Sequence, residues 1–87
     1  MIKEFQNEIR LLQSEIQEIE TQIEDKKEQI RSYRKEIKNL SWNRKWLAPL
    51  MRGTVETMEE TVKLLENKKS FKQEMLNNLT YNNNEKN

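Results

Sequence analysis

The sequence predicts an all-α fold: a long heptad-repeat helix reverses at a Pro/Gly turn into a shorter antiparallel helix, giving a coiled-coil helical hairpin that forms a dimer. Three observations support this prediction. Apolar residues recur at alternating spacings of three and four from the start of the chain, the only proline and the only glycine lie close together at Pro49 and Gly53, and the same spacing resumes after them. One domain over residues 1–79 and a disordered tail over residues 80–87 are expected.

The first helix is expected over residues 2 to about 46. When Ile2 is assigned to heptad position a, every a position up to residue 37 is isoleucine, and no glycine or proline occurs before Pro49. The intervening positions are rich in Glu, Gln, Lys and Arg, which are good helix formers. One d position holds Lys26, and a charged residue there can specify register or partner at some cost in stability.

A turn over about residues 47–53 is predicted from Pro49 and Gly53. Proline lacks a backbone N–H and disfavours helical angles in the residue before it, so the first helix is expected to end before Pro49. Glycine tolerates the left-handed angles that commonly close a helix, and Thr54 is a suitable N-cap for the next one. The chain is therefore expected to reverse direction here.

A second helix is predicted over about residues 54–79, where the heptad resumes. When it is folded back on the first helix with the two heptads in phase, Lys69 lies level with Lys26 and the second helix ends near Ile16. An apolar stripe at the start of the chain would then be uncovered and would need a partner, for which the simplest choice is a second copy. The residues expected to form this homodimer interface are Ile2, Phe5, Ile9, Leu12 and Ile16.

The composition excludes most kinds of chemistry. The chain has no histidine or cysteine, so it lacks the usual side-chain bases, thiolate nucleophiles and soft metal ligands, and a single glycine rules out a phosphate-cradling loop. We expect no enzyme activity, no metal, no cofactor and no small-molecule ligand. No secretory signal or bilayer-spanning segment is visible, so a cytoplasmic protein without membrane contact is expected.

Charge is segregated along the chain, although the net charge is only +1. Residues 1–25 carry two basic and seven acidic groups, residues 26–52 carry nine and two, and residues 53–87 carry five and six. The excess of basic groups in residues 26–52 produces a local electric field that attracts an acidic partner. Tryptophan beside arginine is typical of binding hot spots. The expected partner-binding residues are Arg31, Arg34, Lys35, Lys38, Trp42, Arg44, Lys45, Trp46 and Arg52.

The leading hypothesis is a non-enzymatic protein–protein interaction module whose basic, Trp-containing tip docks on an acidic protein. A small accessory protein of a virus or mobile element that inhibits or recruits a host protein would fit this size and composition. One alternative is a dimer that binds nucleic acid through the same basic patch, and another is a structural assembly or scaffolding coiled coil. A structural alternative also exists for Trp42 and Trp46, in which both turn inward and close the core.

Overall fold

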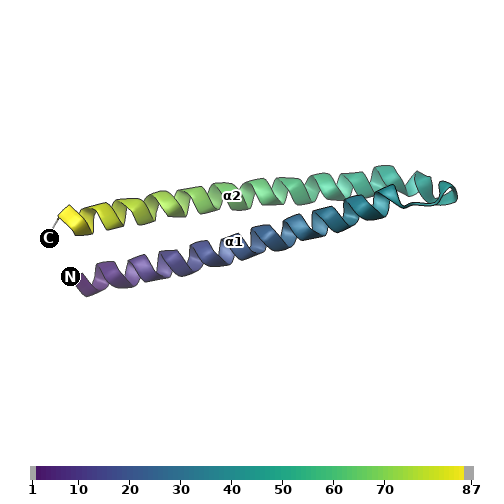
Figure 1. Ribbon diagram of the computed structural model, residues 1–87. Coiled ribbons are helices and arrows are strands. Elements are labelled where there is room, and N and C mark those ends of the chain that lie inside the picture. The colour runs from purple at the N-terminus through teal and green to yellow at the C-terminus, as the bar shows by residue number, and fades with distance from the viewer. Residues whose placement is uncertain (1, 86–87) are drawn as a thin grey trace.

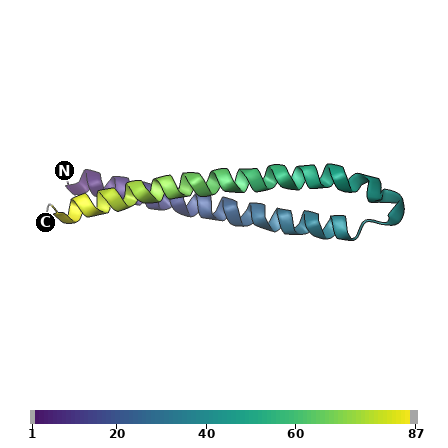
Figure 2. The same cartoon turned by 90° about the horizontal axis from the view of Figure 1, so that it is seen from above.

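The computed structural model describes the backbone of residues 2–85 and the side chains of residues 5–81. It contains the α-helices α1 (Ile2–Lys38) and α2 (Ala48–Glu85), joined through the 3₁₀ helix η1 (Trp42–Leu47). The two α-helices run antiparallel and side by side, so both ends of the chain lie at one end of the molecule and η1 at the other (Figure 1, Figure 2). The predicted all-helical hairpin is confirmed, with no strand in the described part.

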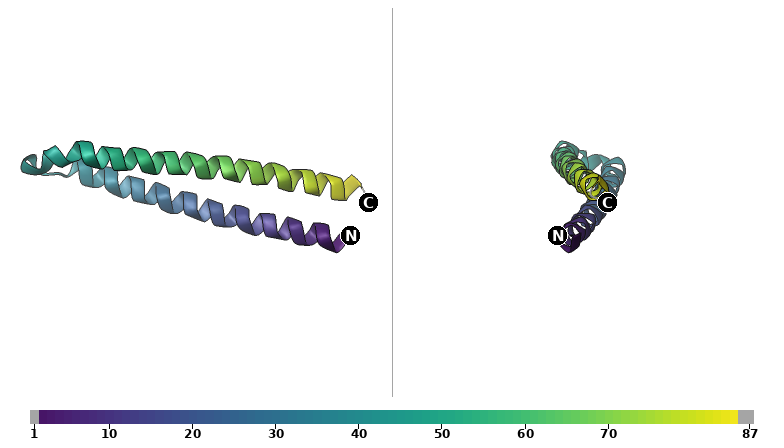
Figure 3. Two further views of the ribbon diagram at one scale, coloured as in Figure 1. Left: turned by 180° about the vertical axis from the view of Figure 1, so that it is seen from behind. Right: turned by 90° about the vertical axis from the view of Figure 1, so that its left-hand side faces the viewer.

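The hairpin is a thin rod that measures 67 × 14 × 13 Å over its Cα atoms. Views from behind and along the rod show the two helices crossing at a shallow angle (Figure 3). They pack through a single row of heptad residues, here called the seam. Fully burying a Val, Leu or Ile side chain is worth about 1.5–3 kcal/mol, so this row is the main source of stability. Its buried side chains, each at most 7% exposed, are Leu12, Ile16, Ile19, Ile23, Ile30, Val55 and Val62.

The register across the seam differs from the predicted one by about one helical turn. Ile30 and Val62 line one hollow between the helices, and Ile23 and Lys69 line another. The predicted pairing of Lys26 with Lys69 is therefore wrong. The observed register is favoured because it separates the two ammonium groups and sets Lys69 beside Ile23 of the facing helix, where a lysine stem can pack.

The turn also lies earlier in the chain than predicted. α1 ends at Lys38 rather than near residue 46, and α2 begins at Ala48. Pro49 therefore occupies the first turn of α2, where proline is tolerated because the N–H groups of that turn have no intrahelical acceptor. Ala48 keeps helical angles, φ −55° and ψ −46°, although it precedes the proline. Gly53 lies inside α2 without a positive φ, so it does not close a helix.

α2 extends beyond residue 79, where the second helix was expected to end. It continues to Glu85, so residues 80–85 of the predicted disordered tail are helical, while residues 86–87 lie outside the described residues. Extending an existing helix by one residue fixes one residue for each hydrogen bond gained, which is less costly than starting a helix. The two long helices are consequently almost equal in length.

The longer α2 covers much of the stripe that was expected to form the homodimer interface. Leu12 and Ile16 are buried inside the single chain, and Phe5 and Ile9 are half-buried. The side chain of Ile2 lies outside the described ones. The expectation that Leu12 lies uncovered was thus wrong, because α2 of the same chain covers it. Ile16, which was expected near the end of the second helix, is buried as well.

Candidate functional site

In the half of the hairpin near the chain ends, acidic residues of α1 lie beside lysines of α2. Lys69 Nζ lies 3.2 Å from Glu20 Oε1, and the Lys72 ammonium donates a hydrogen bond to a carboxylate oxygen of Glu15. Both lysines occupy heptad positions of the seam. They are tolerated because their ammonium groups reach carboxylates at its edge while the aliphatic stems remain against apolar side chains. The acidic first third of the sequence is thus partly neutralised within the chain.

Two of the predicted partner-binding residues form ion pairs within the hairpin. Arg34 Nη2 lies 2.5 Å from Glu59 Oε1 across the two helices, and Arg31 Nη2 lies 2.7 Å from Glu28 Oε2 on α1. All four side chains are well exposed, so each pair contributes about 1 kcal/mol or less. Arg34 therefore helps to align the helices, and both guanidinium groups already have a carboxylate partner within the chain.

The chain reverses through a short hydrogen-bonded connection. The N–H of Asn39 donates to the Lys35 carbonyl at 3.1 Å and ends α1. Ser41 is extended, with φ −64° and ψ 156°, and its Oγ donates to Asn43 Oδ1 at 2.7 Å. The N–H of Arg44 donates to the Ser41 carbonyl at 2.9 Å and opens η1. These contacts hold the backbone around the first tryptophan in a defined conformation.

Both tryptophans face water. Trp42 is 85% exposed and Trp46 is 68% exposed, so neither closes the core. That role belongs to half-buried aliphatic residues instead: Leu40 and Met51 line the same hollow between the helices, and Leu47 is half-buried beside them in sequence at the end of η1. The structure therefore separates the half-buried residues that cap the hairpin from the exposed indoles.

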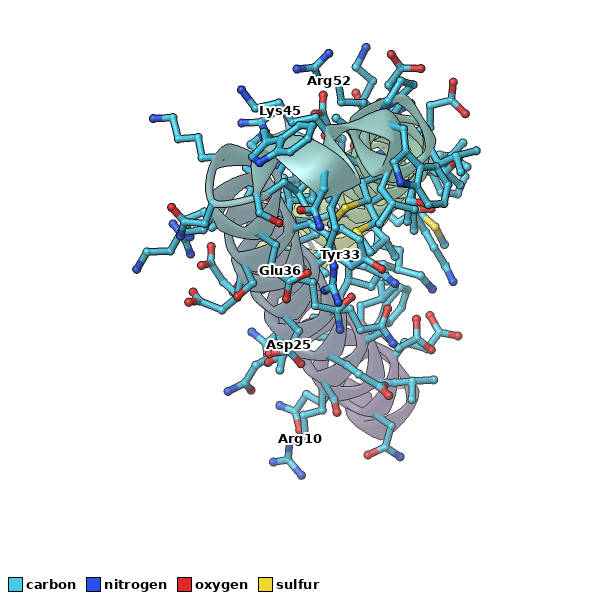
Figure 4. The ribbon with its side chains drawn as sticks, turned by 90° about the vertical axis from the view of Figure 1, so that its right-hand side faces the viewer. Arg10, Asp25, Tyr33, Glu36, Lys45 and Arg52 are labelled. Carbon is cyan, nitrogen blue, oxygen red and sulfur yellow. The ribbon has the colours of Figure 1, made fainter. Side chains whose placement is uncertain are left out.

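Four exposed cations lie around the tryptophans: the segment 38–52 contains two arginines and two lysines but neither Asp nor Glu. Figure 4 views the molecule from this end, with Lys45 and Arg52 at the near end. Among the side chains that the structure describes, no carboxylate oxygen lies within 4 Å of any of the four. We call this surface the basic tip, and its residues are Lys38, Trp42, Arg44, Lys45, Trp46, Leu50 and Arg52.

The cations of the tip come from all three elements. Lys38 of α1 and Arg52 of α2 line one hollow, and Arg44 of η1 shares another with Lys35 of α1. Lys35 and Lys38 lie in the last turn of α1, where a positive charge also stabilises the helix C-terminus. Leu50, which is 66% exposed, was not among the residues expected to bind a partner. Its position between the second tryptophan and Arg52 was the available signal, since these residues are close in the sequence.

The remaining surface offers little for a small ligand or a metal. One hollow, of about 770 Å³, is an open groove between the helices lined mainly by polar side chains. Within the described residues, no group of three or more His, Cys, Asp or Glu is placed to hold a metal ion. In the same part of the chain, no helix is long and apolar enough to cross a membrane. The basic tip is the surface that most resembles a binding site.

Comparison of the chain with protein-family models, with curated proteins and with solved structures found no match. Function is therefore inferred from the surface chemistry of the hairpin.

Proposed function

We propose that the protein is a non-enzymatic interaction module that binds an acidic surface of another protein through the basic tip. The observation that carries this proposal is the exposure of both indoles, 85% for Trp42 and 68% for Trp46, among cations without a described carboxylate partner. Tryptophan and arginine dominate the energetics of protein interfaces, and clustered exposed apolar side chains mark interaction sites. The geometry of the tip therefore favours recognition of a macromolecule.

The two parts of the tip have different roles in this proposal. Trp42 and Trp46 provide rigid apolar area that loses little conformational entropy on binding, whereas Arg44, Lys45 and Arg52 steer the tip toward an acidic partner and fix its orientation. The hydrogen bonds around η1 reduce the ordering cost further, because the connection is already folded. Occupation of the partner's surface would inhibit that partner or recruit it, as an accessory protein does.

An acidic protein is favoured over nucleic acid by the distribution of charge outside the tip. The total charge is only +1, and α1 carries seven acidic residues within the first 25 positions. A long polyanion would be repelled by that part of the rod, since affinity for nucleic acid grows with each phosphate neutralised by a cation. A compact acidic patch contacts the tip without meeting the acidic end.

The hairpin itself is proposed to be a coiled coil that acts as the support for the tip. Heptad periodicity with isoleucine at the a positions is typical of that packing. The homodimer is retained in this proposal, although on a face other than the buried stripe. Self-association is then a property of the hairpin that carries the tip, and partner binding by the tip is the function.

The test is affinity capture from the native cell's lysate, before and after nuclease treatment. A protein partner should remain bound after nuclease, and Trp42→Ala should weaken its binding about 30-fold, which corresponds to the loss of one hot-spot residue. Leu11→Ala is the matched control, because Leu11 is 59% exposed but lies on α1 far from the tip. It should leave capture unchanged.

Two results would contradict the proposal. If Trp42→Ala captures the same partner as strongly as the wild type, the indole is not an anchor. If all bound material is lost on nuclease treatment, and binding weakens log-linearly with salt with a slope that decreases in Arg44→Gln, the tip binds nucleic acid instead.

A further inference from the structure

α2 has a second apolar stripe that α1 does not cover. Leu64 is 69% exposed, Phe71 64% and Met75 41%. With Lys68 between them they follow the same three-four spacing as the seam residues of α2, but each lies one position earlier in the sequence. One residue corresponds to about 100° around a helix. We call Leu64, Lys68, Phe71 and Met75 the outer stripe.

The face continues toward the tip as a row of threonines whose hydroxyl groups are satisfied by their own helix. Thr57 Oγ1 donates to the Gly53 carbonyl at 3.1 Å, and Thr61 Oγ1 donates to the Thr57 carbonyl at 3.0 Å. A threonine that bonds back in this way has its hydroxyl hydrogen committed, so another helix can approach without leaving that donor unsatisfied. The hydroxyl groups of these two threonines are thus compatible with burial.

A helix with two apolar faces about a right angle apart is suited to a bundle, where each helix contacts two neighbours. One face of α2 is occupied by α1. The other has three large apolar side chains in line, which soluble monomers seldom expose together. The occupant can be inferred from the charges that flank the stripe.

We propose that the outer stripe is a homodimer interface, in which α2 packs antiparallel against α2 of a second copy. A two-fold axis that sets Leu64 against Met75 of the second copy also sets Phe71 against Lys68 of the second copy, where the ammonium can lie over the aromatic ring. The four residues of the stripe are therefore complementary to themselves, as an isologous interface requires.

The flanking charges agree with the same register. Lys63 and Glu74 directly precede Leu64 and Met75, so they lie on the same flank of the stripe. In an antiparallel pair each flank of one helix faces the same flank of the other copy, so Lys63 reaches Glu74 of the second copy. The two-fold axis repeats this contact, which gives two such ion pairs in the dimer. Sliding the helices by one heptad would instead set Glu56 near Glu74 of the second copy, which is repulsive. Charge complementarity thus favours the first register over this shifted one.

This dimer can be tested separately from partner binding by the basic tip, because the outer stripe and the basic tip share no residue. An antiparallel pair directs its two tips to opposite ends of the assembly. One dimer would consequently present two separate binding surfaces.

Sedimentation equilibrium of the full chain tests the interface. The wild type should sediment at twice the 10.6 kDa chain mass at tens of micromolar, and Phe71→Glu should sediment as a monomer with unchanged helicity, since Phe71 makes no contribution to the buried cluster. Leu11→Glu places the same charge on an equally exposed leucine of α1 and should remain dimeric. A monomeric wild type, or a dimeric Phe71→Glu variant, overturns the proposal.

A charge exchange tests the antiparallel register separately. Lys63→Glu and Glu74→Lys should each raise the dimer Kd roughly 5- to 30-fold, because two attractive pairs become repulsive. The double variant restores opposite charges and should return the Kd to near the wild-type value. If the double variant dimerises no better than the single ones, the register is wrong.

Discussion

Replacing Gly53 with alanine should stabilise the hairpin. Gly53 lies inside α2 without a positive φ, and a Cβ built on it meets no atom within 4 Å. Glycine in an exposed helix interior costs about 1 kcal/mol relative to alanine, because its backbone loses more conformational freedom on folding. We expect the free energy of unfolding to rise by about 0.5–1 kcal/mol and the Tm to rise by about 2–8 °C in a chain of this size.

Thermal unfolding followed by circular dichroism measures this change. All samples should have one protein concentration, because association raises the apparent Tm by mass action. The matched control is a synthetic chain with D-alanine at position 53, which adds the same atoms with the opposite chirality. D-alanine is disfavoured in a right-handed helix by about 1–2 kcal/mol, so this chain should unfold at a lower temperature than the L-alanine variant.

The opposite order of the two variants would refute the reasoning. If L-alanine lowers the Tm and D-alanine raises it, Gly53 has left-handed angles in solution. A turn at residues 47–53 would then be correct, and α2 would not be continuous through this position.

Two further predictions concern the seam and its edge. Ile30→Ala should lower the free energy of unfolding by about 2–4 kcal/mol in denaturant titration, because Ile30 is only 7% exposed. Leu11→Ala, at a 59% exposed position, should change it by about 0.5 kcal/mol or less. Similar losses in the two variants would mean that Ile30 is not part of the buried seam. A double-mutant cycle of Arg34→Gln and Glu59→Gln should give a coupling free energy of about 1 kcal/mol or less that decreases as salt is added. A larger coupling free energy that does not change with salt would contradict the exposure of this ion pair.

The hairpin was predictable because heptad periodicity is a local property of the sequence. Isoleucines such as Ile16, Ile23 and Ile30 recur every seven residues, and all three are buried in the seam. Each lies on the same face of α1 whichever partner covers that face. The sequence alone therefore identifies the buried face of each helix.

The register and the position of the turn depend on interactions that periodicity does not describe. Sliding one helix past the other by a turn keeps apolar residues in contact, so contacts such as Lys69 with Glu20 distinguish the registers. Pro49 is compatible with two structures, since proline breaks the interior of a helix but is accepted in its first turn. Only the preceding connection through Ser41 decides between them, and its extended angles are set by tertiary structure.

For a related reason, the sequence did not determine whether the tryptophans of the tip are exposed. Counting heptad positions past Leu40 fails once Ser41 leaves the helix, so the orientation of Trp42 cannot be obtained from the spacing. Arg34 shows the converse, because it was expected at the binding site and instead pairs with Glu59, a residue 25 positions away. The cations within the turn segment are close in the sequence, so their position at the turn end of the hairpin follows from the position of the turn.

The thinness of the hairpin determines which surfaces the tip can reach. The radius of gyration is 19.6 Å, whereas a compact domain of this length would have a value of about 12 Å. With side chains, two paired helices are about 20 Å by 10 Å in cross-section. Two indoles at the end of such a rod can enter a channel or a recess of a large assembly that would exclude a globular protein of equal mass, and several tens of ångströms of rod would remain outside.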